Sequence, residues 1–199
     1  MSAGDHHAPD APRAATARCI VVTGPPCSGK SWVAGHLAKH LGLPLISKDD
    51  YKETLFDLIA DGQTLDDGLI NRAAYELLYT TLDRLLRGGV SLIVESNFRP
   101  ARDSARLSNL FREHDCFVRQ VHCDAPAEVL LQRFRDRWEA GQRYPGHDDS
   151  TKIATVAASL REQCYGPLHL PGPLLRLDTT DLARVDLHAL VARLVETPT

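Results

Sequence analysis

Two hydrophobic patterns alternate along this chain. Short runs rich in apolar residues, typical of buried strands, occur at residues 19–23, 43–47, 91–95, 116–123 and 174–177. Between them, apolar residues recur with helical spacing and predict helices at residues 30–41, 51–61, 66–87, 101–113, 127–140, 150–165 and 186–197. Apolar strands separated by amphipathic helices favour a mostly parallel sheet covered on both faces. The sequence therefore predicts a three-layer, doubly wound α/β fold with a five-stranded sheet.

The length and composition suit one folded domain. A chain of 199 residues with 43% hydrophobic content can bury one sizeable core. Residues 1–17 are rich in Ala, Pro and His and predict a disordered tail, which leaves residues 18–199 as the domain. No secretory signal and no apolar stretch of about 20 residues is found, so we expect no membrane association. Five cysteines without C-x-x-C pairs favour a reducing, cytoplasmic location.

The loop between the first predicted strand and the first predicted helix reads Gly24-Pro25-Pro26-Cys27-Ser28-Gly29-Lys30-Ser31. This run, the phosphate loop, matches the pattern G-x-x-x-x-G-K-[ST], in which backbone N–H groups and the helix dipole hold a polyphosphate. The glycines allow close approach, Lys30 is placed to reach the terminal phosphates, and the Ser31 hydroxyl is placed to coordinate Mg²⁺. The loop therefore predicts a bound nucleoside triphosphate.

Ligands of doubly wound sheets bind at the carboxyl ends of the strands, so the residues that follow each strand are candidates for chemistry. Asp49 follows the second predicted strand, where it can accept a proton from an attacking hydroxyl or orient the magnesium shell. A helix cap is the structural alternative for this aspartate, and the adjacent Asp50 is the better candidate for that role. Lys52 lies one helical turn further and predicts contact with the substrate.

The third predicted strand ends in a cluster of polar side chains. Glu95 is suited to bind a water of the magnesium shell or a substrate hydroxyl, and Asn97 and Arg99 to position the acceptor or its charge. The alternative is a hydrogen-bonded strand end that binds no ligand.

Arginines concentrate in a segment that predicts a helical lid at about residues 133–149. Arg133 and Arg137 share one helix face, where nearby triphosphate oxygens would relieve their repulsion, whereas Arg135 is expected to be exposed. A solvated basic face is the alternative. The last predicted strand leads to Thr179, in a loop that commonly passes the adenine base in this architecture.

These motifs together resemble the P-loop kinases of the group that includes the polynucleotide 5′-kinases, chloramphenicol phosphotransferase and the zeta-toxin sugar-nucleotide kinases. The resemblance implies a nucleoside-kinase-like fold and transfer of the γ-phosphoryl group of ATP to a hydroxyl, with Mg²⁺. It also implies phosphate and magnesium binding by Lys30 and Ser31, a general base at Asp49, and a clamp on the phosphoryl group made by Arg133 and Arg137.

The acceptor is less defined than the donor. Polynucleotide kinases carry an arginine where this chain has Lys52, and a lysine cannot make the same bidentate contact with a substrate phosphate. A net charge of -3 and a pI near 6.3 also give no overall attraction to nucleic acid. A small-molecule hydroxyl acceptor is therefore expected ahead of a polynucleotide 5′ end, with an ATPase that lacks an acceptor as the remaining alternative. The protein is expected to be a monomer or a homodimer.

Overall fold

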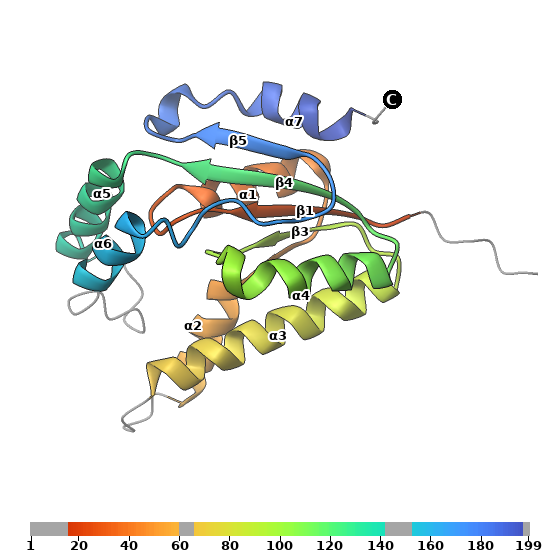
Figure 1. Cartoon of the computed structure of the whole chain (residues 1–199), viewed down its shortest axis with the longest axis horizontal. Coiled ribbons are helices and arrows are strands. Elements are labelled where there is room, and N and C mark those ends of the chain that lie inside the picture. Colours follow the sequence, from red (N-terminus) through yellow and green to blue (C-terminus); the bar gives the residue numbers. More distant parts are fainter. Residues whose placement is uncertain (1–15, 60–65, 142–152, 197–199) are drawn as a thin grey trace, which may run out of the picture.

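The computed structural model describes residues 16–59, 66–141 and 153–196. Its centre is a sheet of five strands in the order β2-β3-β1-β4-β5, and every neighbouring pair is parallel. The strands are β1 (Arg18–Thr23), β2 (Leu45–Ser47), β3 (Leu92–Glu95), β4 (Phe117–Asp124) and β5 (Leu174–Asp178). The predicted three-layer α/β fold is confirmed, and all described strands of its sheet run in the same direction (Figure 1).

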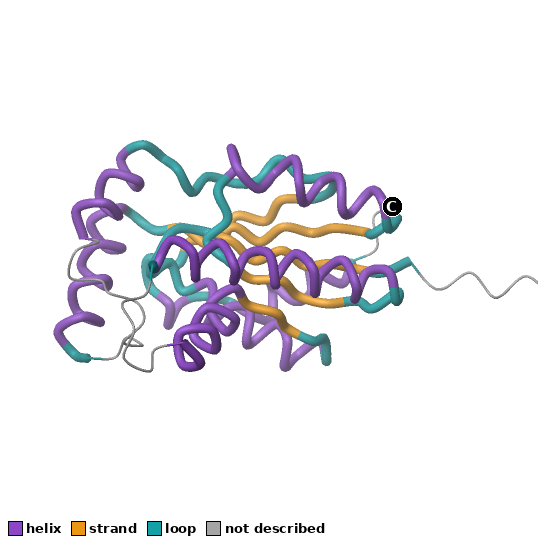
Figure 2. The backbone as a smooth tube through the Cα atoms, turned by 90° about the horizontal axis from the view of Figure 1, so that it is seen from below, coloured by secondary structure: helices purple, strands orange, loops and turns teal. Residues whose placement is uncertain are grey.

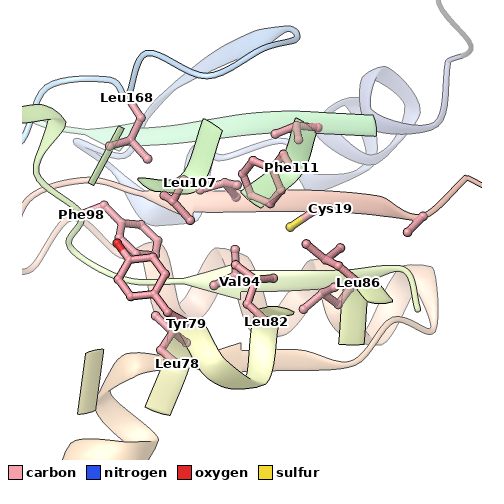
Figure 3. Packing of buried hydrophobic residues seen from close by; sticks show 14 of the residues in the cluster. Cys19, Leu78, Tyr79, Leu82, Leu86, Val94, Phe98, Leu107, Phe111 and Leu168 are labelled. Carbon is pink, nitrogen blue, oxygen red and sulfur yellow. The ribbon is translucent and has the colours of Figure 1, made fainter. Parts of the chain in front are cut away.

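Helices cover both faces of the sheet because successive strand residues point to opposite sides. On β1, Cys19 and Val21 pack under α3 (Asp67–Arg87) and α4 (Pro100–Glu113), whereas Ile20 and Val22 pack under α1 (Lys30–Leu41) and α7 (Leu187–Val195). Figure 2 shows the strands enclosed between helices, and Figure 3 shows the apolar side chains of the α3 and α4 face. The two buried clusters fix the position of every strand end.

The remaining helices lie near the carboxyl ends of the strands. Figure 1 shows α5 (Ala127–Glu139) and α6 (Ile153–Arg161) at the side to which the arrows of β4 and β5 point, and α2 (Lys48–Ile59) beside α3. No helix within the described ranges is long and apolar enough to cross a membrane.

Helix ends differ from the prediction where side chains cap the backbone. The helix predicted from residue 51 begins three residues earlier, at Lys48, because the Ser47 hydroxyl accepts the N–H of Asp49 at 3.3 Å. Asp50 therefore lies inside the first turn of α2, and the expectation that it caps this helix is wrong. At the last helix, the carboxylate of Asp186 accepts the N–H of Ala189, so α7 begins at Leu187.

Other differences concern the ends of the predicted segments. The helix predicted at residues 150–165 is α6, which ends at Arg161 before Gln163 adopts a φ of 52°. A short 3₁₀ helix, η1 (Leu182–Arg184), was not predicted. Most of the predicted tail, and the lid beyond residue 141, lie outside the described residues.

Candidate active site

The phosphate loop connects the central strand β1 to helix α1 and is packed tightly against its surroundings. Gly24 has a φ of 147°, and a Cβ atom at this position would lie 2.1 Å from the carbonyl oxygen of Cys123 on β4. Gly29 has a φ of 76° and faces Leu182 of η1. Cys27 adopts a φ of 62°, which is uncommon for a residue that carries a side chain. The backbone path is therefore set by strand and 3₁₀-helix neighbours on two sides.

The amino end of α1 is open to an anion. No side chain caps this helix, and its first turn carries no acidic residue, so its N–H groups and its positive dipole end are available to a phosphate. Lys30 is buried and its Nζ donates to the carbonyl of Pro25 across a long 3.4 Å, inside the same loop. The loop thus has the polarity that the sequence pattern predicts.

An oxygen-rich cluster lies beside the phosphate loop. The carboxylate of Glu95 accepts the Ser47 hydroxyl at 2.8 Å and the Ser31 hydroxyl at 3.4 Å through the same oxygen, Oε2. Its second oxygen, Oε1, is buried and has no hydrogen-bond partner among the described residues. Burial raises the pKa of Glu95; the positive charge of Lys30 opposes this effect, and the negative charge of Asp49 reinforces it.

This cluster fits a hard cation. Carboxylate and hydroxyl oxygens are the ligands that Mg²⁺ prefers, and a cation would offset the cost of burying an ionised Glu95. Ser31 and Glu95 are the residues that would hold the ion or its water shell.

Asp49 lies at the same edge of the sheet, in the first turn of α2. Its carboxylate is 42% exposed and forms an ion pair with the buried Nζ of Lys48 at 2.7 Å. Lys48 also donates to the amide oxygen of Asn71 at 3.3 Å and lies over the ring of Tyr75, both on α3. Lys48 thus fixes Asp49 against α3, a role that its sequence position did not suggest.

Lys52 is engaged within the protein. Its Nζ is buried and lies 2.6 Å from the carboxylate of Asp67 at the start of α3. In this structure Lys52 links α2 to α3, and its contact with a substrate stays a prediction.

The polar cluster after β3 is highly connected. The Tyr75 hydroxyl contacts the amide oxygen of Asn97 at 3.2 Å and the Ser96 hydroxyl at 3.1 Å. The guanidinium of Arg99 donates to the Tyr165 hydroxyl at 3.1 Å. Tyr75 and Tyr79 are mainly buried in the core on the α3 and α4 face.

The lid arginines point to backbone carbonyls and to Cys27. Arg133 donates to the carbonyls of Thr179 and Thr180 at 2.8 and 3.0 Å, and lies 3.5 Å from the carbonyl of Cys27. Arg137 lies 4.0 Å from the Cys27 sulfur. Arg133 therefore joins α5, the loop after β5 and the phosphate loop.

The other predictions for this region divide into three groups. Arg135 is exposed, as expected. The Thr179 hydroxyl donates to the carbonyl of Asp124, so this side chain is directed into the protein and its loop would contact a base through the backbone. The part of the predicted lid at residues 142–149 lies outside the described residues.

Sequence reasoning missed two residues of the site. Ser47 was treated only as the end of a strand, and its register with Glu95 follows from the pairing of β2 with β3 in the structure. Lys48 carried no local signal, because its partners on α3 are more than twenty residues away.

A phosphate loop on the central strand of a five-stranded parallel sheet, with arginines on a helix above it, defines a P-loop kinase fold. Residues 19–162 match the family model described as an AAA domain, and the chain belongs to this family.

The curated relatives that the chain matches are uncharacterized mycobacterial proteins. The chain is 31% identical over 172 residues to the uncharacterized protein Rv2004c of Mycobacterium tuberculosis, an alignment that covers 83% of this chain and 32% of the relative. The chain thus spans about a third of the length of the curated relatives it matches.

Solved structures show the same fold. A candidate kinase from Chloroflexus aurantiacus superposes with a TM-score of 0.79 at 37% identity, over 90% of this chain and 96% of that one. A gluconokinase from Sinorhizobium meliloti 1021 has a TM-score of 0.55 at 20% identity, over 92% of this chain and 94% of that one, which shows the fold alone.

Proposed function

We propose that this protein transfers the γ-phosphoryl group of ATP to a hydroxyl of a small-molecule acceptor. The observation that carries the proposal is the arrangement of two acidic groups beside the phosphate loop. Glu95 is buried next to Ser31 and Lys30, on the donor side, and Asp49 is partly exposed at the end of the neighbouring strand. Separate acidic groups for the magnesium shell and for the acceptor hydroxyl are what phosphoryl transfer requires.

The donor half binds and orients the triphosphate. The N–H groups of residues 27–31 and the Lys30 ammonium hold the β- and γ-phosphates, and the positive end of α1 favours their charge. Mg²⁺, when bound through Ser31 and Glu95, neutralises charge that develops on the phosphate oxygens. Arg133 holds the loop after β5 against the phosphate loop, which keeps the base side and the phosphate side of the nucleotide in fixed relation.

The acceptor half supplies a base. Asp49 accepts the proton of the attacking hydroxyl, whose oxygen forms a bond to the γ-phosphorus while the bond from that phosphorus to the β,γ-bridging oxygen breaks. ADP leaves, and the phosphorylated acceptor and one proton are the other products. Lys48 keeps Asp49 oriented through the 2.7 Å ion pair, so the carboxylate does not have to be ordered during the reaction.

Transfer of label from [γ-³²P]ATP to hydroxylated acceptors tests the proposal. We expect Lys30→Ala to lower turnover by about 100-fold or more, because it removes a charge that stabilises the transition state. The matched control is Lys39→Ala, at the exposed far end of α1, which should behave as wild type.

The base is tested separately. Asp49→Asn should reduce transfer by about 100-fold or more and leave ATP bound, because only the proton acceptor is lost. Asp57→Asn, on the exposed side of α2, is the control. Hydrolysis of ATP that no acceptor alters would instead favour an ATPase, and transfer that survives in Asp49→Asn would refute its assignment as the base.

A further inference from the structure

Positive side chains are numerous around the acceptor side of the site, and most of them are neutralised. Three of these side chains each lie within 2.8 Å of a carboxylate: Lys48 pairs with Asp49, Lys52 with Asp67, and Arg102 with Asp103. Arg99, four residues beyond the end of β3 and at the N-cap of α4, forms no ion pair with any described residue. Its charge therefore has no carboxylate partner within the part of the chain that the structure describes.

Arg99 is held in place without being neutralised. Its backbone N–H donates to the carboxylate of Asp103 at 2.7 Å, and Asp103 is itself buried and bound by Arg102. Its guanidinium donates to the Tyr165 hydroxyl and lies 5.1 Å from the centre of that ring. Among the described residues this is the guanidinium's one hydrogen-bond partner, so most of its five N–H groups remain for a ligand.

Asn97 adds donors beside this charge. The Ser96 hydroxyl donates to the Tyr75 oxygen, so the proton of Tyr75 is directed to the amide oxygen of Asn97. This order assigns the Asn97 oxygen as an acceptor inside the protein and leaves its NH₂ group, which has no partner among the described residues, as a double donor.

Donors without acceptors, next to an unpaired cation, favour one chemical class of ligand. A neutral polyol needs acceptors as well as donors, whereas a carboxylate or a phosphate accepts from every side. Ser47 pairs with Glu95, and Asp49 and Asn97 each lie two residues beyond this pair. The proposed base, in the first turn of α2, and the donors after β3 therefore lie at the same end of two neighbouring strands.

We propose that the acceptor carries an oxyanion, either a carboxylate or a phosphate monoester, that binds to Arg99 and to the Asn97 amide while its hydroxyl faces Asp49. This inference rests on the proposed phosphoryl transfer. It restricts the acceptor to small hydroxylated acids or phosphate esters.

Matched pairs of acceptors test the inference in the [γ-³²P]ATP assay. The pairs are gluconate with glucitol, glycerate with glycerol, and adenosine 3′-monophosphate with adenosine, so the first two probe a carboxylate and the third a phosphate. We expect the acidic member of at least one pair to have a kcat/KM about 10- to 100-fold above its neutral partner. Arg99→Met should remove most of that difference through KM, and Arg99→Lys should restore part of it, because a lysine keeps the charge but not the bidentate geometry.

The matched control is Arg112→Met, on the exposed end of the same helix, which should keep the wild-type preference. Neutral acceptors that are used as well as the acids, or a preference that survives in Arg99→Met, would overturn the inference.

Binding is measured separately, so that failure of the inference can be told from failure of the proposed transfer. The protein is first saturated with Mg·ADP, which occupies the phosphate loop, and thermal unfolding is then followed with each of the six compounds. A rise in unfolding temperature that occurs with acids only and is lost in Arg99→Met supports the anion site. If no label is transferred in that case, the proposed phosphoryl transfer is refuted, whereas the anion site is supported. No Arg99-dependent rise with any acid would overturn the site.

Discussion

Replacement of Gly24 by alanine tests how tightly the phosphate loop is packed. The new Cβ atom would lie 2.1 Å from the carbonyl oxygen of Cys123, whereas ordinary contacts begin near 3.4 Å. The φ of 147° is also unfavourable for any residue with a side chain. Backbone strain and overpacking each cost about 1–3 kcal/mol, so we expect the free energy of unfolding to fall by about 3 kcal/mol. For a chain of this size that loss lowers the unfolding temperature by about 6–12 °C.

Alanine at two other glycines distinguishes the effect of the collision from the effect of its position in the phosphate loop. In Gly172→Ala the new Cβ atom would collide in the same way, 2.2 Å from the carbonyl oxygen of Val118, but at the opposite end of β4. Gly35→Ala, on α1, meets no atom within 4 Å and should stabilise the protein by up to about 1 kcal/mol through helix propensity.

The assays are thermal unfolding without nucleotide and ATP binding at a temperature where all variants are folded. We expect Gly24→Ala and Gly172→Ala to unfold at similarly lowered temperatures, and only Gly24→Ala to lose ATP affinity as well. Unfolding of Gly24→Ala within about 2 °C of wild type would refute the close packing of this loop against β4.

Three further results are expected. Because burial raises the pKa of Glu95, its ionisation destabilises the nucleotide-free protein as the pH rises above 4.5. Glu95→Gln should therefore gain stability relative to wild type between pH 4.5 and 8. A difference in denaturant unfolding that does not change with pH would contradict this. Asp103→Asn should lower the free energy of unfolding by about 1–3 kcal/mol, because the buried carboxylate accepts from Tyr79, Arg99 and Arg102 through both oxygens and an amide has only one; no change in the denaturation midpoint would exclude that role. Arg133→Met should raise the KM for ATP about tenfold, since it frees the loop after β5, while the exposed Arg135→Met serves as a control; equal effects of the two would indicate general loss of positive charge.

Local sequence signals were sufficient for the fold because the central strands β1 and β3 place apolar residues on both faces of the sheet. Their apolar runs have no other stable location than the middle of a covered sheet. Helix ends were less predictable, since the start of α2 depends on the Ser47 hydroxyl, which stands in a strand and gives no helical signal.

The candidate site was predictable to the extent that its residues follow strands. Lys30, Ser31, Asp49 and Glu95 do so, and the parallel sheet brings them to one edge. The partners of Arg133 were not predictable, because the packing of α5 decides whether its guanidinium meets phosphates or the carbonyls of Thr179 and Thr180.

The parts of the site follow strands that differ in their number of hydrogen-bonded neighbours. β1 carries the phosphate loop and is hydrogen-bonded on both sides, whereas β2, which leads to Asp49, and β5, which leads to the loop of Thr179, are edge strands with one neighbour each. Substitutions on β2 or β5 disturb one ladder only and leave the two ladders of β1, which support the phosphate loop, in place. This geometry allows new acceptor specificities to evolve by changes at the edge of the sheet, at little cost to the folding of the donor site.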